Sequence, residues 1–129
     1  MVDMAPSPTQ QTGHRSENRT ALWLERQGLH VLERNLLCRA GEIDLVARDG
    51  AVLVFVEVRY RGSASHGGAA ASVNRHKQRR LLRAARYFLP SLVRRHFAGR
   101  QPACRFDVVC EQDGRLQWIR HAFMEDQGR

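Results

Sequence analysis

The sequence lacks the features that mark membrane-spanning and secreted proteins. Its longest uninterrupted apolar run is six residues, from Ala51 to Val56, whereas a helix that spans a bilayer needs roughly 18–20 apolar residues. The first residues do not form a basic segment followed by an apolar one, so we expect no signal peptide. No internal repeat is present. These absences exclude a membrane-spanning class and favour a cytoplasmic protein.

Cysteine is scarce too, and its spacing excludes two further classes. The three cysteines form no C-x-x-C pair, and the six histidines show no metal-ligand spacing. Neither a disulfide framework nor a structural zinc site is therefore expected, and the thiols are predicted to be reduced core residues. With 129 residues, of which 43% are apolar, we expect one domain over residues 14–124, with tails at 1–13 and 125–129.

Acidic residues are absent from a long central segment. No Asp or Glu occurs between Val58 and Phe106, and the whole chain carries a net charge of +8. Lys77 is the single lysine, so nearly all the positive charge is arginine. Such a one-sided field favours a polyanionic partner, with nucleic acid ahead of an anionic membrane. The alternative is a strongly solvated arginine-rich face without a specific partner.

Periodicity and turn residues predict an alternating pattern of helices and strands. The order is α-β-β-β-α-β-β, which indicates an α/β fold with a central mixed sheet flanked by helices. The second and third strands form a hairpin through an Asp49-Gly50 type I′ turn. The expected helices are 16–27, 72–89 and a short piece at 90–98, and the expected strands are 29–35, 42–48, 51–59, 104–110 and 115–123.

The hairpin gathers carboxylates on one face. With Asp49 and Gly50 as the turn, Arg48 lies opposite Ala51, and Asp44 is then diagonal to Glu57. The shared face holds Glu42, Asp44, Leu53, Phe55, Glu57 and Arg59. The opposite face of the third strand carries alternating valines at 52, 54, 56 and 58, which indicates a central, covered strand. Buried acids require compensation. An arginine ion pair and a divalent cation such as Mg²⁺ are the two alternatives.

Two segments of this hairpin resemble a known signature. Gly41-Glu-Ile-Asp44, followed by Val56-Glu57-Val58-Arg59, is similar to the D…(D/E)-x-K signature of the PD-(D/E)XK, or restriction-endonuclease-like, superfamily. Over about residues 13–124 the chain more closely resembles the YraN family of small bacterial proteins. The matching pieces are Glu17, Arg34-Asn35, Gly41 to Val46, Phe55 to Arg59, Lys77 to Leu81, Ala85, Tyr87, Leu89 and Arg105 to Val108.

The resemblance implies a fold and a set of site residues. It implies an α-β-β-β-α-β nuclease core in which Asp44 and Glu57 hold Mg²⁺ or Mn²⁺. Glu17 resembles the extra acid that many members add on the first helix, although a glutamate favoured by the helix dipole is an equal alternative. Glu42 is interpreted as either a supporting acid or a surface group. By the same resemblance the protein could form a homodimer.

Arg59 departs from the signature, because the superfamily has a lysine there. Arginine stays protonated and cannot take a proton from water, but it can stabilise charge on a phosphate. Lys77 is the candidate replacement, because it shares a helix face with Val73, Leu81 and Ala84 that should pack on the sheet. The alternative is a lysine that extends to solvent at the helix edge.

Other arginines are candidates for contacts with nucleic acid. Arg61 and the glycine-rich segment 62–71 follow directly after the third strand. The candidate nucleic-acid-binding residues are Arg61, Arg75, Lys77, Arg79 and Arg80. The preferred hypothesis is a metal-dependent endonuclease-like protein acting on DNA, branched DNA included, with Asp44, Glu57, Arg59 and Lys77 as catalytic residues. The alternatives are a nucleic-acid-binding module without catalysis and a basic interaction or scaffold protein.

Overall fold

The computed structural model describes residues 8–62 and 73–123. Most of the expected glycine-rich segment, part of the expected N-terminal tail and all of the expected C-terminal tail therefore lie outside the described residues. The elements are α1 (Pro8–Arg26), β1 (His30–Cys38), β2 (Gly41–Asp49), β3 (Val52–Gly62), α2 (Arg75–His96), β4 (Ala103–Gln112) and β5 (Arg115–Phe123). The predicted order of helices and strands is confirmed.

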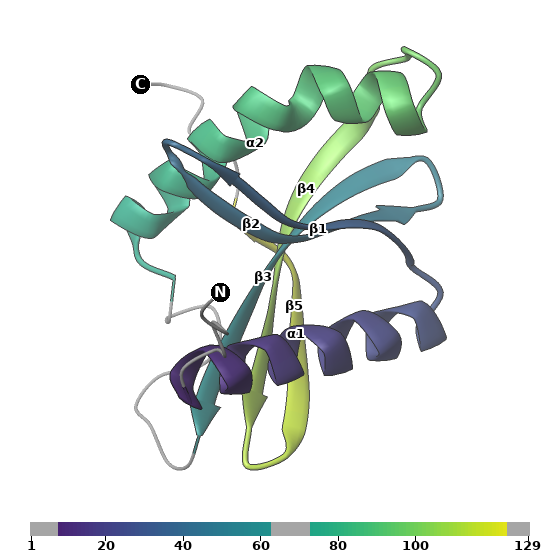
Figure 1. The fold of residues 1–129 in the computed structure, drawn as a ribbon. Coiled ribbons are helices and arrows are strands. Elements are labelled where there is room, and N and C mark those ends of the chain that lie inside the picture. The colour runs from purple at the N-terminus through teal and green to yellow at the C-terminus, as the bar shows by residue number, and fades with distance from the viewer. Residues whose placement is uncertain (1–7, 63–72, 124–129) are drawn as a thin grey trace, which may run out of the picture.

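The five strands form one twisted mixed sheet (Figure 1). Their order in space equals their order in the chain, β1-β2-β3-β4-β5. Only β3 and β4 run parallel, and α2 is the crossover between them. The remaining neighbours are antiparallel. The third strand is thus central, as its unbroken apolar sequence predicts.

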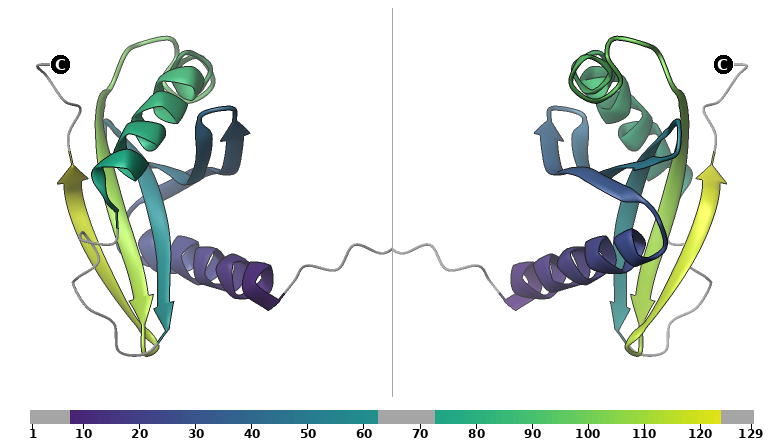
Figure 2. Two further views of the ribbon diagram at one scale, coloured as in Figure 1. Left: turned by 90° about the vertical axis from the view of Figure 1, so that its left-hand side faces the viewer. Right: turned by 90° about the vertical axis from the view of Figure 1, so that its right-hand side faces the viewer.

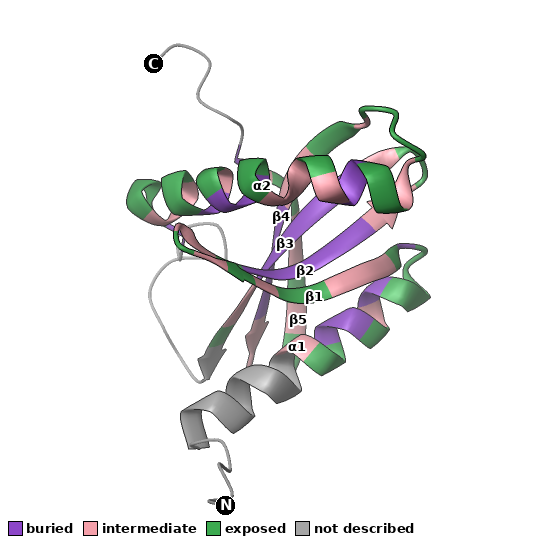
Figure 3. Ribbon diagram, turned by 45° about the horizontal axis from the view of Figure 1, so that its top comes forward, coloured by how far each residue is buried: buried purple, intermediate pink, exposed green. Residues whose placement is uncertain are grey.

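One helix covers each face of the sheet (Figure 2). On the α2 side, Leu81, Ala84 and Leu92 pack with Phe55 and Val108. The α1 side has a second core, whose buried members are Ala21, Leu24, Leu29, Leu45, Ala47, Val54, Val56 and Val109. Figure 3 shows buried residues on the strands between the helices and on the sheet-facing side of each helix. The architecture is three layers, α/β/α.

Both helices extend beyond their predicted limits. Helix α1 begins at Pro8 rather than Ser16. Helix α2 begins after Asn74, whose side chain accepts a hydrogen bond from the backbone N–H of Lys77, and it continues through Pro90 to His96. The two expected helical pieces, 72–89 and 90–98, are one helix with Pro90 inside it, and Leu92 and Val93 beyond the proline are buried. Packing of the last turns against the sheet outweighs the backbone hydrogen bond that proline removes.

The hairpin between β2 and β3 has a different register from the predicted one. Asp49 pairs with Val52, so the turn residues are Gly50 and Ala51. Gly50 has a φ of 60° and Ala51 is not among the residues with positive φ, which is the pattern of a type II′ turn rather than type I′. The register moves by two residues in total. Because a shift of two keeps every side chain on its face, the predicted common face of Asp44 and Glu57 survives.

The packing predicts unequal effects of two leucine substitutions on α1. Leu24 is fully buried against the sheet, whereas Leu22 is 59% exposed. We expect Leu24→Ala to lower the free energy of unfolding by about 2–4 kcal/mol, through lost burial and a residual cavity. Leu22→Ala serves as the matched control, with a change within about 0.5 kcal/mol. Urea denaturation measures both, and equal effects would contradict the placement of α1.

Candidate active site

Two carboxylates are buried where β2 and β3 separate. Leu45 opposite Val56 is the last pair of the hairpin ladder, and Asp44 and Glu57 are the next residues on the two strands. Only 8% of Asp44 and 5% of Glu57 is exposed. The Val58 backbone N–H donates to Asp44 Oδ2 at 2.8 Å. A side-chain oxygen of β2 thus accepts from the β3 backbone where regular strand pairing has ended.

The environment of Asp44 opposes its ionisation. Its pKa rises from 3.8 to about 8, chiefly because burial removes the carboxyl from water and next because the Glu57 carboxylate lies nearby. The Val58 N–H lowers the pKa, while Glu17 and Glu42 raise it by smaller amounts. Four acids therefore act on one another at this edge of the hairpin. This arrangement is unfavourable unless a proton or a cation is held there.

Two cations meet the Glu57 carboxylate. Lys77 Nζ lies 3.4 Å and the Arg59 guanidinium 3.5 Å from Glu57 Oε2. Arg59 comes from the same strand, two residues on, whereas Lys77 comes from the first turn of α2. Lys77 is half-buried, with 36% of its side chain exposed. The prediction that the single lysine reaches the acidic cluster is therefore confirmed, while its role stays a prediction.

Glu17 and Glu42 are joined by a residue that the sequence did not single out as functional. The Asn35 side-chain nitrogen, assigned from its surroundings, donates to Glu17 Oε1 at 2.8 Å and to Glu42 Oε2 at 3.2 Å. Asn35 lies in β1 and has a φ of 55°. Asparagine tolerates this left-handed conformation better than most residues. The only sequence signal was that Arg34-Asn35 is among the pieces that match the family.

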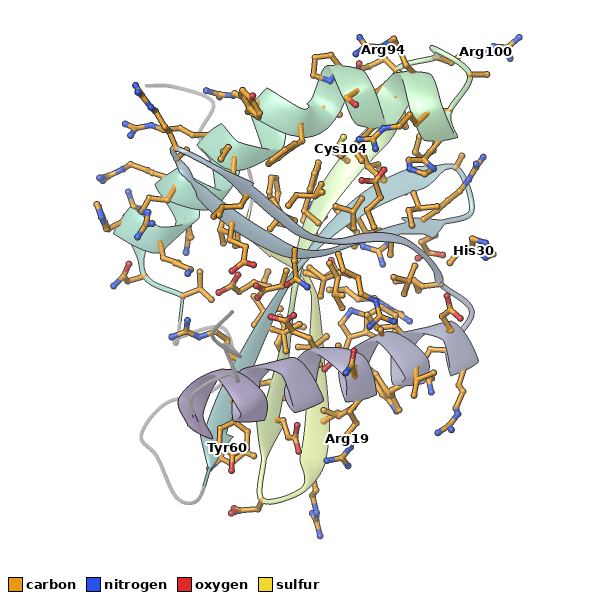
Figure 4. All side chains as sticks on the ribbon, viewed as in Figure 1. Arg19, His30, Tyr60, Arg94, Arg100 and Cys104 are labelled. Atoms are coloured by element: carbon orange, nitrogen blue, oxygen red, sulfur yellow. The ribbon has the colours of Figure 1, made fainter. Side chains whose placement is uncertain are left out.

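The candidate nucleic-acid contacts lie mainly on the outer side of α2. Arg75 and Arg79 are exposed, as the helical periodicity predicts. Arg80 is exposed too, and its Nε donates to the Ala40 carbonyl at 3.1 Å in the β1–β2 turn. Arg61 belongs to β3, but its side chain lies outside the described residues. Figure 4 shows Arg94 and Arg100 projecting outward at the other end of this helix.

A further buried acid, Asp107, belongs to a separate structural network. Its carboxylate accepts from Arg105 Nε at 3.0 Å, from Trp118 Nε1 at 3.0 Å and from the His121 backbone N–H at 2.9 Å. Arg105 also donates to Asp49 Oδ2 at 2.8 Å. These bonds connect β4 with β5 and with the β2–β3 turn. The donors satisfy the buried charge, so Asp107 is explained by stability alone.

The three cysteines differ in burial, so the prediction that all of them are core residues holds only in part. The three cysteines are free. Cys110 is buried in the core, as predicted, but Cys38 is half-buried and Cys104 is exposed. The prediction that all three thiols are core residues is therefore wrong for Cys104. That residue is the second of β4.

The donor set of the acidic cluster suits a hard divalent cation. Asp44 and Glu57 offer carboxylate oxygens only, and Mg²⁺ is commonly held by one or two carboxylates together with water. Within residues 8–62 and 73–123, no group of three or more His, Cys, Asp or Glu side chains forms a ready-made metal site. The pKa of Asp44 is raised chiefly by burial and secondly by the Glu57 carboxylate, and a bound cation would offset both effects. The residues therefore fit Mg²⁺ or Mn²⁺ through two ligands.

The fold and the cluster together define a class of protein. A mixed sheet between two helices, with Asp44 and Glu57 on the adjacent strands β2 and β3, is consistent with the restriction-endonuclease-like core of the PD-(D/E)XK superfamily. The order of elements from α1 to β4 matches the α-β-β-β-α-β pattern. Neither helix in the described part of the chain is long and apolar enough to cross a membrane.

The chain belongs to the family described as "Uncharacterised protein family UPF0102", whose model matches residues 16–110. This family is the one that the motifs indicated as YraN. A UPF0102 protein of Alkalilimnicola ehrlichii is 53% identical over 119 residues, covering 92% of this chain and 91% of its own. A UPF0102 protein of Bordetella parapertussis is 58% identical over 117 residues, covering 91% of this chain. The match spans 66% of that longer relative.

The raised pKa of Asp44 predicts a pH-dependent gain in stability for Asp44→Asn. Folded wild type keeps the Asp44 proton up to about pH 8, whereas the unfolded chain releases it near pH 4. The contribution of Asp44 to the free energy of unfolding therefore falls as the pH rises from 4 toward 8. Asparagine keeps an acceptor for the Val58 N–H without the charge. We expect Asp44→Asn to be more stable than wild type by about 2–4 kcal/mol at pH 8, with a much smaller difference at pH 4.

Thermal or urea unfolding in metal-free buffer at several pH values measures this difference. Asp113→Asn is the matched control, because Asp113 is exposed in a turn with a φ of 53° that asparagine also tolerates. A gain for Asp44→Asn that is equal at pH 4 and pH 8 would contradict a charge-based origin.

Proposed function

We propose that this protein is a metal-dependent nuclease that hydrolyses phosphodiester bonds in DNA. The observation that carries the proposal is the pair of buried carboxylates, Asp44 and Glu57, at the point where β2 and β3 separate. A divalent cation bound there would supply Lewis-acid chemistry, polarising the phosphate and lowering the pKa of an attacking water. Asp44 and Glu57 would hold Mg²⁺ or Mn²⁺, with Glu17 as the candidate third acid.

Lys77 and Arg59 would act on the charge of the scissile phosphate. Both contact Glu57, so both lie at the edge of the acidic cluster rather than on the outer helix face. Arg59 stays protonated and can stabilise the charge that develops on the phosphate oxygens. Lys77 occupies the role that the superfamily assigns to a strand lysine, but reaches the site from α2. The chain thus has arginine in place of the superfamily lysine at position 59, and α2 adds a second cation, Lys77, at the same site.

The charge distribution supports DNA as the partner. Every charged side chain of α2 is basic, and the helix lies entirely within the segment without acids. Exposed arginines such as Arg75 and Arg79 would contact backbone phosphates on either side of the site. Binding would take place in the cytoplasm, and a homodimer would bring together two sites for paired strands.

A second candidate function is a nucleic-acid-binding module without catalysis. Arg59 favours it, because arginine cannot act as a base where the superfamily has lysine. In that case Lys77 and Arg59 are ion-pair partners of Glu57, and the basic surface alone carries the function. A basic scaffold for acidic proteins is the third alternative, and it needs neither Asp44 nor Glu57.

Cleavage assays separate these functions. We expect labelled single-stranded, duplex or four-way-junction DNA to be cut in Mg²⁺ or Mn²⁺, and cleavage to fall at least about 100-fold in Asp44→Asn and in Glu57→Gln. DNA binding, measured across salt concentrations, should persist in both variants and weaken as salt rises. Salt-sensitive binding without cleavage by wild type would contradict the nuclease and favour the binding module.

Substitutions of the two cations test how their roles are divided. We expect Lys77→Met to reduce cleavage about 100-fold or more, because it removes the only amine near Glu57 among the described residues. Arg59→Lys should retain cleavage, since it keeps a cation at that position. Arg83→Met on the exposed face of α2 is the matched control for charge loss and should stay within a few-fold of wild type. Equal losses in Lys77→Met and Arg83→Met would contradict a special role for Lys77.

A further inference from the structure

Asn35 occupies an unusual position beside the acidic cluster. It is a non-glycine residue with positive φ inside a strand, and its carboxamide contacts acids from two other elements, Glu17 of α1 and Glu42 of β2. An amide nitrogen carries two hydrogens, and each of them is directed to one carboxylate. The left-handed backbone and the two hydrogen bonds are separate observations, and both concern how this side chain is placed.

Other contacts besides these hydrogen bonds join α1 to the sheet. The next residue along each element makes a parallel contact, in which Arg34 NH1 donates to Asn18 Oδ1 at 2.6 Å. The buried face of α1, including Ala21 and Leu24, anchors the helix on the sheet. The contact from Asn35 to Glu17 is therefore one of several between α1 and the sheet, and it also constrains the direction of the Glu17 carboxylate.

Asn35 is uncharged, and this indicates what its contact with the two acids does. An arginine at this position would tie Glu17 and Glu42 together and cancel part of their charge. Asparagine holds the two carboxylates while leaving their negative charge intact, and that charge acts on Asp44. Like charges repel, so a neutral donor that bonds both carboxylates favours keeping them side by side. Holding like charges together is useful where a cation is to be bound.

We infer that Asn35 is a positioning residue for the cation site, which directs the Glu17 carboxylate toward the ion held by Asp44 and Glu57. The inference rests on the proposed function, because it requires a divalent cation at these acids. Asn35 itself does not touch the ion. It acts through Glu17, as residues beyond the ligands commonly do when they fix the orientation of a metal-binding side chain.

Asn35→Gly is the discriminating variant. Glycine adopts a φ of 55° without strain, so the substitution removes the carboxamide and leaves the backbone in place. Asp113→Gly is the matched control, because Asp113 has nearly the same φ, 53°, in an exposed turn away from the cluster. We expect the melting temperature of metal-free Asn35→Gly to change no more than that of Asp113→Gly.

The main readout is the affinity of the full chain for Mn²⁺. Calorimetry measures it, as does the electron paramagnetic resonance of free Mn²⁺. We expect Asn35→Gly to weaken Mn²⁺ binding about 10–100-fold, with Asp113→Gly equal to wild type. In a Glu17→Gln background, the same change at Asn35 should cost less than about twofold, because its effect passes through Glu17.

Each outcome has a distinct meaning. Wild-type affinity in Asn35→Gly, or an equal loss with and without Glu17→Gln, would overturn the positioning role while leaving the nuclease proposal intact. Absence of Mn²⁺ binding by wild type at millimolar concentrations would contradict the proposed function and this inference together. A loss of affinity confined to the chain that still carries Glu17 would support the inference.

Discussion

The rest of the site depends on one electrostatic constraint, the burial of Asp44 beside Glu57. Two carboxylates removed from water repel each other and lose their hydration, and neither loss is recovered by the strands themselves. Regular pairing of β2 and β3 ends at Leu45 and Val56, which frees the Val58 N–H for Asp44. The same break leaves Glu57 open to Lys77 and Arg59. The Val58 N–H, Lys77 and Arg59 compensate this pair, whereas Glu17 and Glu42 add to the negative charge around it.

The two helices contribute charges of opposite sign to that constraint. Helix α2 brings Lys77 to Glu57 from its first turn, where the Asn74 cap fixes the start of the helix. Helix α1 brings Glu17, whose charge adds to the negative field at Asp44. Separate apolar cores hold the helices on opposite faces of the sheet. The acidic cluster is therefore built from three layers, and it requires the complete fold.

The sequence predicted those features that depend on side-chain period. A period of two placed Asp44 and Glu57 on a common face, and a period of 3.6 placed Lys77 on the inner side of α2. The hairpin register was wrong because it depends on one turn, where Gly50 alone takes positive φ. The predicted end of α2 was wrong because the burial of Leu92 stabilises the helix beyond Pro90. The contacts of Asn35 with Glu17 and Glu42 were missed because they involve a left-handed backbone conformation that composition does not reveal.

The division of labour between arginine and lysine follows from the same constraint. An arginine-rich surface attracts polyanions, whereas the acidic cluster repels them. Arg59 keeps a permanent charge beside Glu57, so it offsets the buried carboxylate at every physiological pH. The single lysine, a compact charge on a flexible chain, is placed at the one point where that cluster meets the basic helix. A cation between Asp44 and Glu57 would turn this local repulsion into attraction for a phosphate, which is why the basic surface and the acidic cluster make sense as one site.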